Sequence, residues 1–232
     1  MKITKLNFTF SVLLFLFISN QISAQTTSDL GAWYMYFGGI KFEESQWGIH
    51  GEAQYRNHNI IGDLEQLLLR TGLQYHLKDN SATFTLGYGN ITTENEGEPD
   101  NTFYENRIYQ EALLRQDIYS VNLNHRFRYE QRFVDTQSLR TRFRYALFIN
   151  IPLTQKKFAP GGFYIPVYNE IFINGEERGN IEYFDRNRLY LGLGYVLKNY
   201  LKAQVGVMEQ STRNSSKTQL QFSLHHGISV GK

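Results

Sequence analysis

Residues 119–132 read YSVNLNHRFRYEQR, and their side chains separate into two alternating sets. The odd positions are mostly apolar or aromatic: Tyr119, Val121, Leu123, His125, Phe127, Tyr129 and Gln131. The even positions are polar or charged: Ser120, Asn122, Asn124, Arg126, Arg128, Glu130 and Arg132. Because successive side chains of a β-strand point to opposite faces, this stretch predicts a strand with one apolar and one charged face.

The N-terminal segment has the features of a secretory signal. Lys2 and Lys5 form a basic start, and residues 8–18 form an apolar run that is too short to span a bilayer as a helix. Small and polar residues follow, ending at Ala24. This order predicts a cleaved signal peptide over residues 1–24, the alternative being a buried N-terminal helix. Residues 25–232 are then expected to form a single outer-membrane β-barrel domain.

The charge balance and composition exclude several classes of function. The chain has 24 Lys and Arg and 22 Asp and Glu, and residues 1–24 carry two of the lysines and no acid. The remaining chain is electrically balanced, which argues against a nucleic-acid partner. The absence of cysteine excludes disulfides, thiolate zinc sites and a cysteine nucleophile. His50, His58 and His76 do not share one face at ligand spacing, so we predict no metal and no cofactor.

The period-two alternation recurs along most of the chain. It is clear over residues 47–56, 66–77, 82–89, 139–150 and 188–197, and less regular over 103–114. Residues 163–174, 201–208 and 220–230 complete ten predicted strands, the facing of 163–174 being left open. Apolar outward and polar inward rows predict an all-β fold, an antiparallel transmembrane up-and-down β-barrel of about 10–12 strands with a polar Arg/Glu-lined interior.

Residues 30–37 form one further candidate strand that does not fit an even count. Either it pairs with an undetected partner to make twelve strands, or it packs outside the meander. An even count would put both ends of the barrel in the periplasm. Tight connections at 77–81, 115–118 and 198–200 mostly alternate with longer ones at 90–101, 174–180 and 211–217. The connection 151–162 is longer than its place predicts.

Several short motifs carry a resemblance to a known family. They are Trp33, RTGLQY (70–75), ENRIYQ (105–110), HRFRYEQRF (125–133), RFRY (142–145), YNEIF (168–172) and NRLYLGLGY (187–195). In this order they resemble a family of predicted outer-membrane barrels described as domain of unknown function 2490. The resemblance covers nearly all of the chain after residue 24. It implies a barrel in the outer membrane and supplies no activity and no catalytic residue.

The inner row of charges is the candidate site. Its predicted members line the lumen: Glu52, Arg70, Arg126, Arg128, Glu130, Arg132, Arg140, Arg142, Arg144, Glu170 and Arg188. Arg pairs with carboxylates in a two-pronged fork, so these residues can join neighbouring strands, and we expect Glu130 to bridge an arginine across its hairpin. Two interpretations stay open: a structural ion-pair network that fills the lumen, or an anion-selective constriction or acidic-ligand site.

The pattern leaves three classes of function open. They are a small pore or transport barrel, a structural or surface-binding barrel with a filled lumen, and a lipid-modifying acyl hydrolase. His225 beside Ser223 is a weak signal for the third class, because no glycine-framed nucleophile and no orienting third group accompany it, and we predict no catalytic residue. The expected partners are outer-membrane lipid, the barrel-assembly machinery during insertion and, as a candidate, a small anionic solute.

Overall fold

The computed structural model describes residues 30–97, 99, 101–135, 137–154, 158–176, 179 and 181–231, and the backbone of residues 25–26. The predicted signal peptide, residues 1–24, lies outside the described residues. The described part of the chain contains no helix, and therefore none that is long and apolar enough to cross a membrane. Its elements are β1 (Gln25–Thr26), β2 (Gly31–Phe42), β3 (Trp47–Asn57), β4 (Leu64–His76), β5 (Ala82–Glu94), β6 (Thr102–Ile118), β7 (Val121–Val134), β8 (Arg140–Pro152), β9 (Phe163–Asn174), β10 (Phe184–Lys198), β11 (Leu201–Ser211) and β12 (Ser215–Val230).

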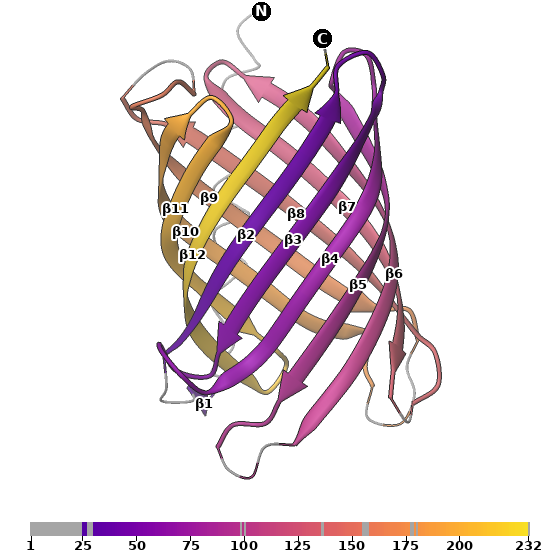
Figure 1. The fold of residues 1–232 in the computed structure, drawn as a ribbon. Helices are drawn as coiled ribbons and strands as arrows, with labels where there is room; N and C mark the ends of the chain where they lie inside the picture. Colours follow the sequence, from indigo (N-terminus) through magenta and orange to yellow (C-terminus); the bar gives the residue numbers. More distant parts are fainter. Residues whose placement is uncertain are drawn as a thin grey trace, which may run out of the picture.

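The eleven long strands, β2 to β12, form one closed sheet, in which the strands run obliquely around the wall (Figure 1). Neighbours in sequence pair antiparallel from β2 to β12, and the barrel closes by a parallel pairing of β12 with β2. That closing ladder is continuous from Gln219 opposite Gly31 to Val230 opposite Phe42. The predicted all-β barrel of about 10–12 strands is confirmed, and the parallel closing pair is its one departure from an up-and-down meander among the long strands.

The two expectations for residues 30–37 are wrong. The segment belongs to β2, which needs no undetected partner and does not lie outside the meander, because it pairs with β3 on one side and β12 on the other. An unpaired strand edge leaves backbone N–H and C=O groups without partners, and closing the barrel on β2 removes the free edges of both β3 and β12. With an odd number of alternating strands, the first and last run in the same direction, so the closing pair has to be parallel.

The odd count also places the ends of the wall on opposite sides. Gly31 begins β2 at the end that carries the connections 58–63, 95–101, 135–139, 175–183 and 212–214, which we call the loop end. Val230 finishes β12 at the other end, the turn end, beside the connection 43–46, where Glu43 N donates to Val230 O at 2.9 Å. An even count would have put both ends of the barrel on one side, and the odd count of long strands puts them on opposite sides.

Two connections differ from their predicted lengths. Tyr119 does not open a strand but lies with Ser120 in a two-residue turn, at a φ of 56° and with 96% of its side chain exposed. β6 continues to Ile118, which pairs directly with Val121, and two-residue hairpin turns favour positive φ. The predicted long connection 211–217 is also wrong, because β12 begins at Ser215 and leaves residues 212–214 as a tight turn.

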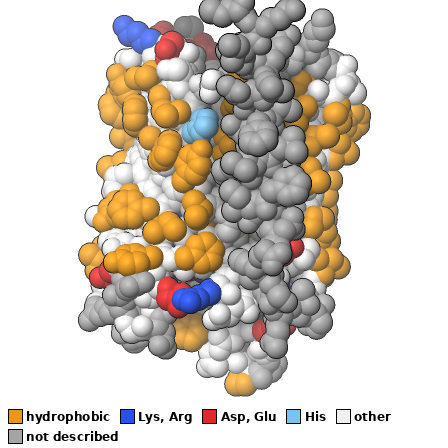
Figure 2. Space-filling model, turned by 180° about the vertical axis from the view of Figure 1, so that it is seen from behind, with side chains coloured by type: hydrophobic (Ala, Val, Ile, Leu, Met, Phe, Trp, Pro, Cys, Tyr) orange, Lys and Arg blue, Asp and Glu red, His pale blue; other side chains and the backbone are white. Residues whose placement is uncertain are grey.

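The alternation of side chains gives the barrel an apolar outside. Figure 2 shows hydrophobic side chains over much of the visible wall, with the visible charged side chains toward its two ends. Outward residues near the middle of their strands, such as Leu69, Tyr88, Phe127 and Leu191, are more than a third exposed. The inner face is the reverse, since most of its charged residues are almost fully buried: Glu52, Arg56, Arg70, Glu105, Arg107, Arg128, Glu130, Arg142, Arg144, Glu170 and Arg188.

Candidate functional site in the lumen

Glu130 on β7 is the centre of the inner charge network. Its side chain is completely buried, and it accepts hydrogen bonds from Arg142 Nη2 and Arg144 Nη1, both at 2.6 Å. Register explains the contacts, because Glu130 lies directly opposite Arg142 on β8, and Arg144 follows two residues later on the same face. The expectation that Glu130 bridges an arginine across its hairpin is confirmed.

Glu170 is the second shared carboxylate, and it settles the facing of β9. Its Oε1 accepts from Arg126 Nη2 on β7 at 2.7 Å and lies 2.7 Å from Arg144 Nη2 on β8. Three strands are therefore joined through one carboxylate. The even-numbered residues of β9, including Tyr164 and Phe172, face the lumen together with Glu170, and all of them except Tyr168 are buried.

The remaining predicted lumen residues pair with acids in most cases. Arg70 Nη1 donates to Glu52 at 3.0 Å across β3 and β4. Arg132 Nη2 donates to Glu105 at 3.0 Å, and Arg128 Nε donates to Glu111 at 2.6 Å. The last two bonds link β7 to β6, and all three show that the charged row is largely a cross-strand ion-pair network.

Arg140 and Arg188 lie on the inner face but do not join this network. Arg140 Nη1 donates to Gln137 Oε1 at 3.3 Å, next to the loop end, and no carboxylate of the described residues lies within 4.0 Å of it. Arg188 Nε donates to Gln210 Oε1 at 2.9 Å, and no carboxylate of the described residues lies within 4.0 Å of its guanidinium. Arg188 lies opposite Glu170 on β9, but the Glu170 carboxylate pairs with Arg126 and Arg144, so a shared inner face does not mean a shared ion pair.

Sequence reasoning missed several members of the lumen. Arg56, Glu105, Arg107, Glu111, Asp185 and Arg186 all contribute charge there. The signal was available in part, because apolar residues at the even positions Tyr104, Ile108 and Ala112 indicate that the odd positions of β6 point inside. Asp185 and Arg186 were harder to find, because a register irregularity between Phe184 and Arg186 interrupts the alternation at the start of β10.

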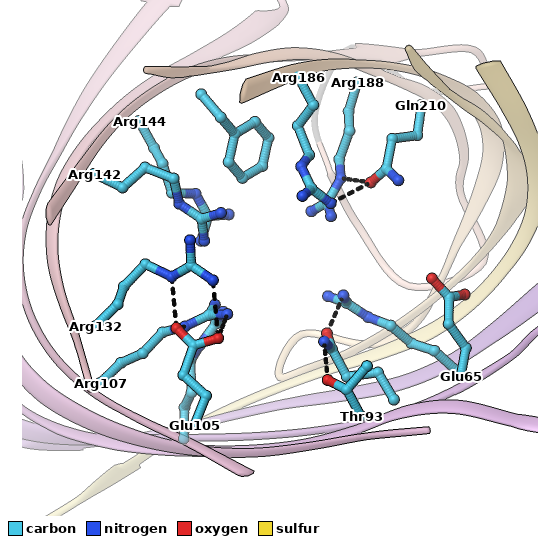
Figure 3. A pocket seen from close by; sticks show the side chains of 14 residues that line it. Glu65, Thr93, Glu105, Arg107, Arg132, Arg142, Arg144, Arg186, Arg188 and Gln210 are labelled. Carbon is cyan, nitrogen blue, oxygen red and sulfur yellow. Dashed lines mark hydrogen bonds and ion pairs between the residues drawn. The ribbon is translucent and has the colours of Figure 1, made fainter. Parts of the chain in front are cut away.

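A cavity of about 280 Å³ lies among these arginines on the side of the loop end (Figure 3). Eight arginines and two glutamates contribute to its lining, and in Figure 3 the labelled arginines extend their guanidinium groups toward its centre. The lining comes from strand segments next to the loop end, such as Glu65, Thr93 and Gln210. Its charged members are Arg56, Glu65, Arg70, Glu105, Arg107, Arg132, Arg142, Arg144, Arg186 and Arg188.

Aromatic side chains occupy the lumen nearer the turn end. Tyr168 on β9 stacks on Tyr190 on β10, with ring centroids 4.9 Å apart, and Tyr109 and Tyr164 are also buried inside. The connection between β8 and β9 adds to this layer, because Phe158 packs edge-on against Tyr164 at 5.2 Å. Gly161 N donates to Val196 O at 2.9 Å and ties that connection to β10. The unexpected length of residues 153–162 therefore brings Phe158 against the inner wall.

The weak hydrolase signal gains no support from geometry. Ser223 Oγ lies 3.0 Å from His225 Nε2, but the pair faces the lumen, and the His225 ring stacks on Phe37 at 4.8 Å. Among the described residues no carboxylate hydrogen-bonds to His225. His125 and His226 face outward, where each bonds a tyrosine hydroxyl: His125 with Tyr145 at 2.9 Å and His226 with Tyr36 at 2.8 Å.

Comparison with known families identifies the family to which the chain belongs. The model of a family described as Protein of unknown function (DUF2490) matches residues 30–221, which run from the start of β2 into β12. The chain belongs to this family. The predicted resemblance is thereby confirmed, and the family description assigns no activity. No curated protein and no solved structure matches the chain. Function therefore has to be argued from the lumen and the outer wall.

Proposed function

We propose that this member of the family is an outer-membrane β-barrel whose lumen is closed, and that it acts as a membrane-embedded binding barrel rather than an open pore. The apolar outer wall supports the membrane assignment, because an outward band of apolar and aromatic residues is what a bilayer requires of a barrel. The predicted signal peptide over residues 1–24 supports export. By the usual rule of short periplasmic turns and longer outer loops, the turn end faces the periplasm.

The filled lumen is the observation that carries the proposal. Glu130 is 0% exposed and Glu170 is 3% exposed, although both lie on the inner wall. Ion pairs fill the lumen next to the loop-end cavity, and tyrosine rings fill it nearer the turn end. Phe158 packs against one of these rings from the turn end. Small barrels commonly fill their interiors with side chains, and such a filling leaves no wide aqueous path.

A conductance measurement tests the closed lumen. The barrel, purified from outer membranes in detergent, is added to planar bilayers, with a known porin as the positive control. The proposal expects no discrete current steps above baseline, together with outer-membrane fractionation and heat-modifiable gel migration. Regular steps of porin size would overturn the closed lumen, and recovery of a soluble periplasmic protein without detergent would overturn the membrane assignment.

A narrow anion pathway is the second candidate function. It rests on the excess of arginine over glutamate around the loop-end cavity. Rings of Arg or Lys favour anions in pores, so small steps that reverse at the anion equilibrium potential in a salt gradient would favour this candidate. The same bilayer experiment therefore separates the two candidates.

A further inference from the structure

We propose that the loop-end cavity is a binding site for a small polyvalent oxyanion, a molecule bearing phosphate or carboxylate groups, with Arg56 and Arg188 as its principal ligands. The inference deepens the proposed function, because it names what a closed binding barrel would hold. It stands on the lining of the cavity, the burial of the two arginines and the absence, among the described residues, of a carboxylate within 4.0 Å of either.

The lining arginines divide into two groups by their partners. Six of the eight have a carboxylate oxygen within 4.0 Å: Arg70, Arg107, Arg132, Arg142, Arg144 and Arg186. Arg56 and Arg188 have no carboxylate oxygen within 4.0 Å among the described residues. Each of these two residues is only 7% exposed. A buried charge without a counter-charge is strongly unfavourable. Carboxylates act on these two arginines only at longer range, Glu65 and Glu52 on Arg56 and Glu170 on Arg188, so both positions favour an anion in direct contact.

Neutral groups hold the two arginines in place without neutralising them. Arg56 donates to Gln54 and, at 2.6 Å, to Gln66, and Arg188 donates to Gln210. Both guanidinium groups lie over the Trp33 ring, at 3.8 Å and 4.8 Å from its centroid. Stacking on an aromatic face orients a guanidinium plane while leaving its edge free for hydrogen bonds. Each side-chain nitrogen of Arg56 already donates to Gln54 or Gln66, so Arg188 offers the freer edge to a ligand that accepts hydrogen bonds.

Arg188 has the unused donors that such a ligand needs. Its Nε bonds Gln210, and within the described residues neither Nη1 nor Nη2 has a hydrogen-bond partner. Both nitrogens are accessible to solvent, and because Arg188 lines the cavity, they face it. Phosphate and carboxylate groups match the planar fork of arginine with paired oxygens, whereas a halide offers a single sphere.

The cavity is reachable from the loop end, and of the two glutamates in its lining Glu105 is paired with arginines whereas Glu65 is not. Arg186, another member of the lining, has a side chain that is 30% exposed. Glu65 also lines the cavity, forms no ion pair within 4.0 Å among the described residues, and has a buried Oε2 without a hydrogen-bond partner. The negative charge of Glu65 should weaken the binding of an anion in the cavity. Removing that charge should therefore change the affinity in the opposite direction to the removal of an arginine.

Isothermal titration calorimetry of the folded barrel in detergent tests the site. Sodium pyrophosphate and sodium citrate are titrated separately, with sodium chloride at the same ionic strength as the reference. The proposal expects saturable binding of at least one of the two oxyanions, weakened about tenfold or more by Arg188→Gln or Arg56→Gln. Glu65→Gln should tighten binding. Arg213→Gln, an exposed arginine in the 212–214 turn paired with Glu182, is the matched control and should leave the affinity unchanged.

A second measurement keeps the test independent of variant folding. Wild-type barrel is treated with phenylglyoxal, and modified arginines are located by mass spectrometry with and without pyrophosphate or citrate. Protection of Arg188 and Arg56 by the oxyanion, but not by chloride, supports the site. Absence of saturable binding by both oxyanions, equal protection by chloride, or unchanged affinity in Arg188→Gln would overturn it. None of these outcomes bears on conductance or membrane location, so failure here is distinguishable from failure of the proposed function.

Discussion

Arg144 donates a hydrogen bond to Glu130 at 2.6 Å across the inner face of the β7–β8 hairpin, where Glu130 is completely buried. The same arginine lies 2.7 Å from Glu170 on β9, so one side chain connects three strands. Arg142 completes the cluster by pairing with both Glu130 and Asp185. Removal of one member of a buried pair leaves the other charge uncompensated, which makes this cluster the expected centre of stability in the lumen.

Glu130→Gln should destabilise the barrel by about 3 kcal/mol, because it removes the charge that Arg142 and Arg144 share in a buried site. Each arginine keeps a second carboxylate, which limits the loss. The measurement is the midpoint of urea unfolding in detergent. The control is Glu182→Gln, which removes an exposed ion pair with Arg213 and should cost about 0–1 kcal/mol. Equal losses in the two variants would show that the lumen network does not hold the barrel together.

The outward face can be tested by placing a charge on it. Leu191 lies near the middle of β10 and is 60% exposed. If the wall faces lipid, Leu191→Arg should cost about 2–4 kcal/mol and reduce assembly, measured as the heat-modifiable fraction in outer membranes. Leu153→Arg makes the same change in a connection outside the strands and should assemble normally. Equal assembly of the two variants would contradict a bilayer around the wall.

Gly87 leaves the space that Tyr109 fills inside the barrel. A Cβ at Gly87 would lie 2.1 Å from Tyr109 Cζ, and Tyr109 is only 1% exposed. Gly87→Ala should therefore destabilise the barrel by about 1–3 kcal/mol through overpacking. Gly51→Ala is the matched control, because a Cβ there meets nothing within 4 Å. Urea unfolding measures both variants, and a Gly87→Ala protein as stable as wild type would mean that the tyrosine layer is loosely packed.

The parallel closure can be tested with introduced cysteines, since the chain has none of its own. Tyr36 and Leu224 are opposite each other on β2 and β12, and both point outward. The double variant Tyr36→Cys with Leu224→Cys should form a disulfide under mild oxidation, because adjacent strands lie about 5 Å apart. Gel migration after heating reports the cross-link.

The control for closure keeps one cysteine and moves the other. Tyr36→Cys with Val230→Cys places the second thiol six residues farther along β12, about 20 Å away, and should not cross-link. A barrel closed by β3 on β12, with β2 outside the wall, would cross-link neither pair. That result would restore an even strand count and contradict the parallel closure.

Much of the inner wall could be predicted from the sequence, because the alternation of side chains along a strand is a local property. The facing of Arg126, Arg128 and Glu130 follows from residues 119–132 alone. The same logic fails at the start of β10, where an irregular register separates Phe184 from Arg186. It also fails at the turns, because the extension of β6 to Ile118 depends on pairing with β7.

The sequence alone determined the strand character of the chain and the division of most strands into an apolar outer row and a charged inner row. Strand number, parallel closure and the choice of ion partners were decided by tertiary structure. Arg144 meets Glu170 across 26 positions, and Arg126 meets the same carboxylate across 44, so their pairing depends on the registers of intervening strands. Arg188 has the same local pattern and lies opposite Glu170 on β9, yet that carboxylate pairs with Arg126 and Arg144, and Arg188 donates to Gln210 on β11 instead. A residue's face is set by its own strand, whereas its partner is set by how the strands are arranged around the closed barrel.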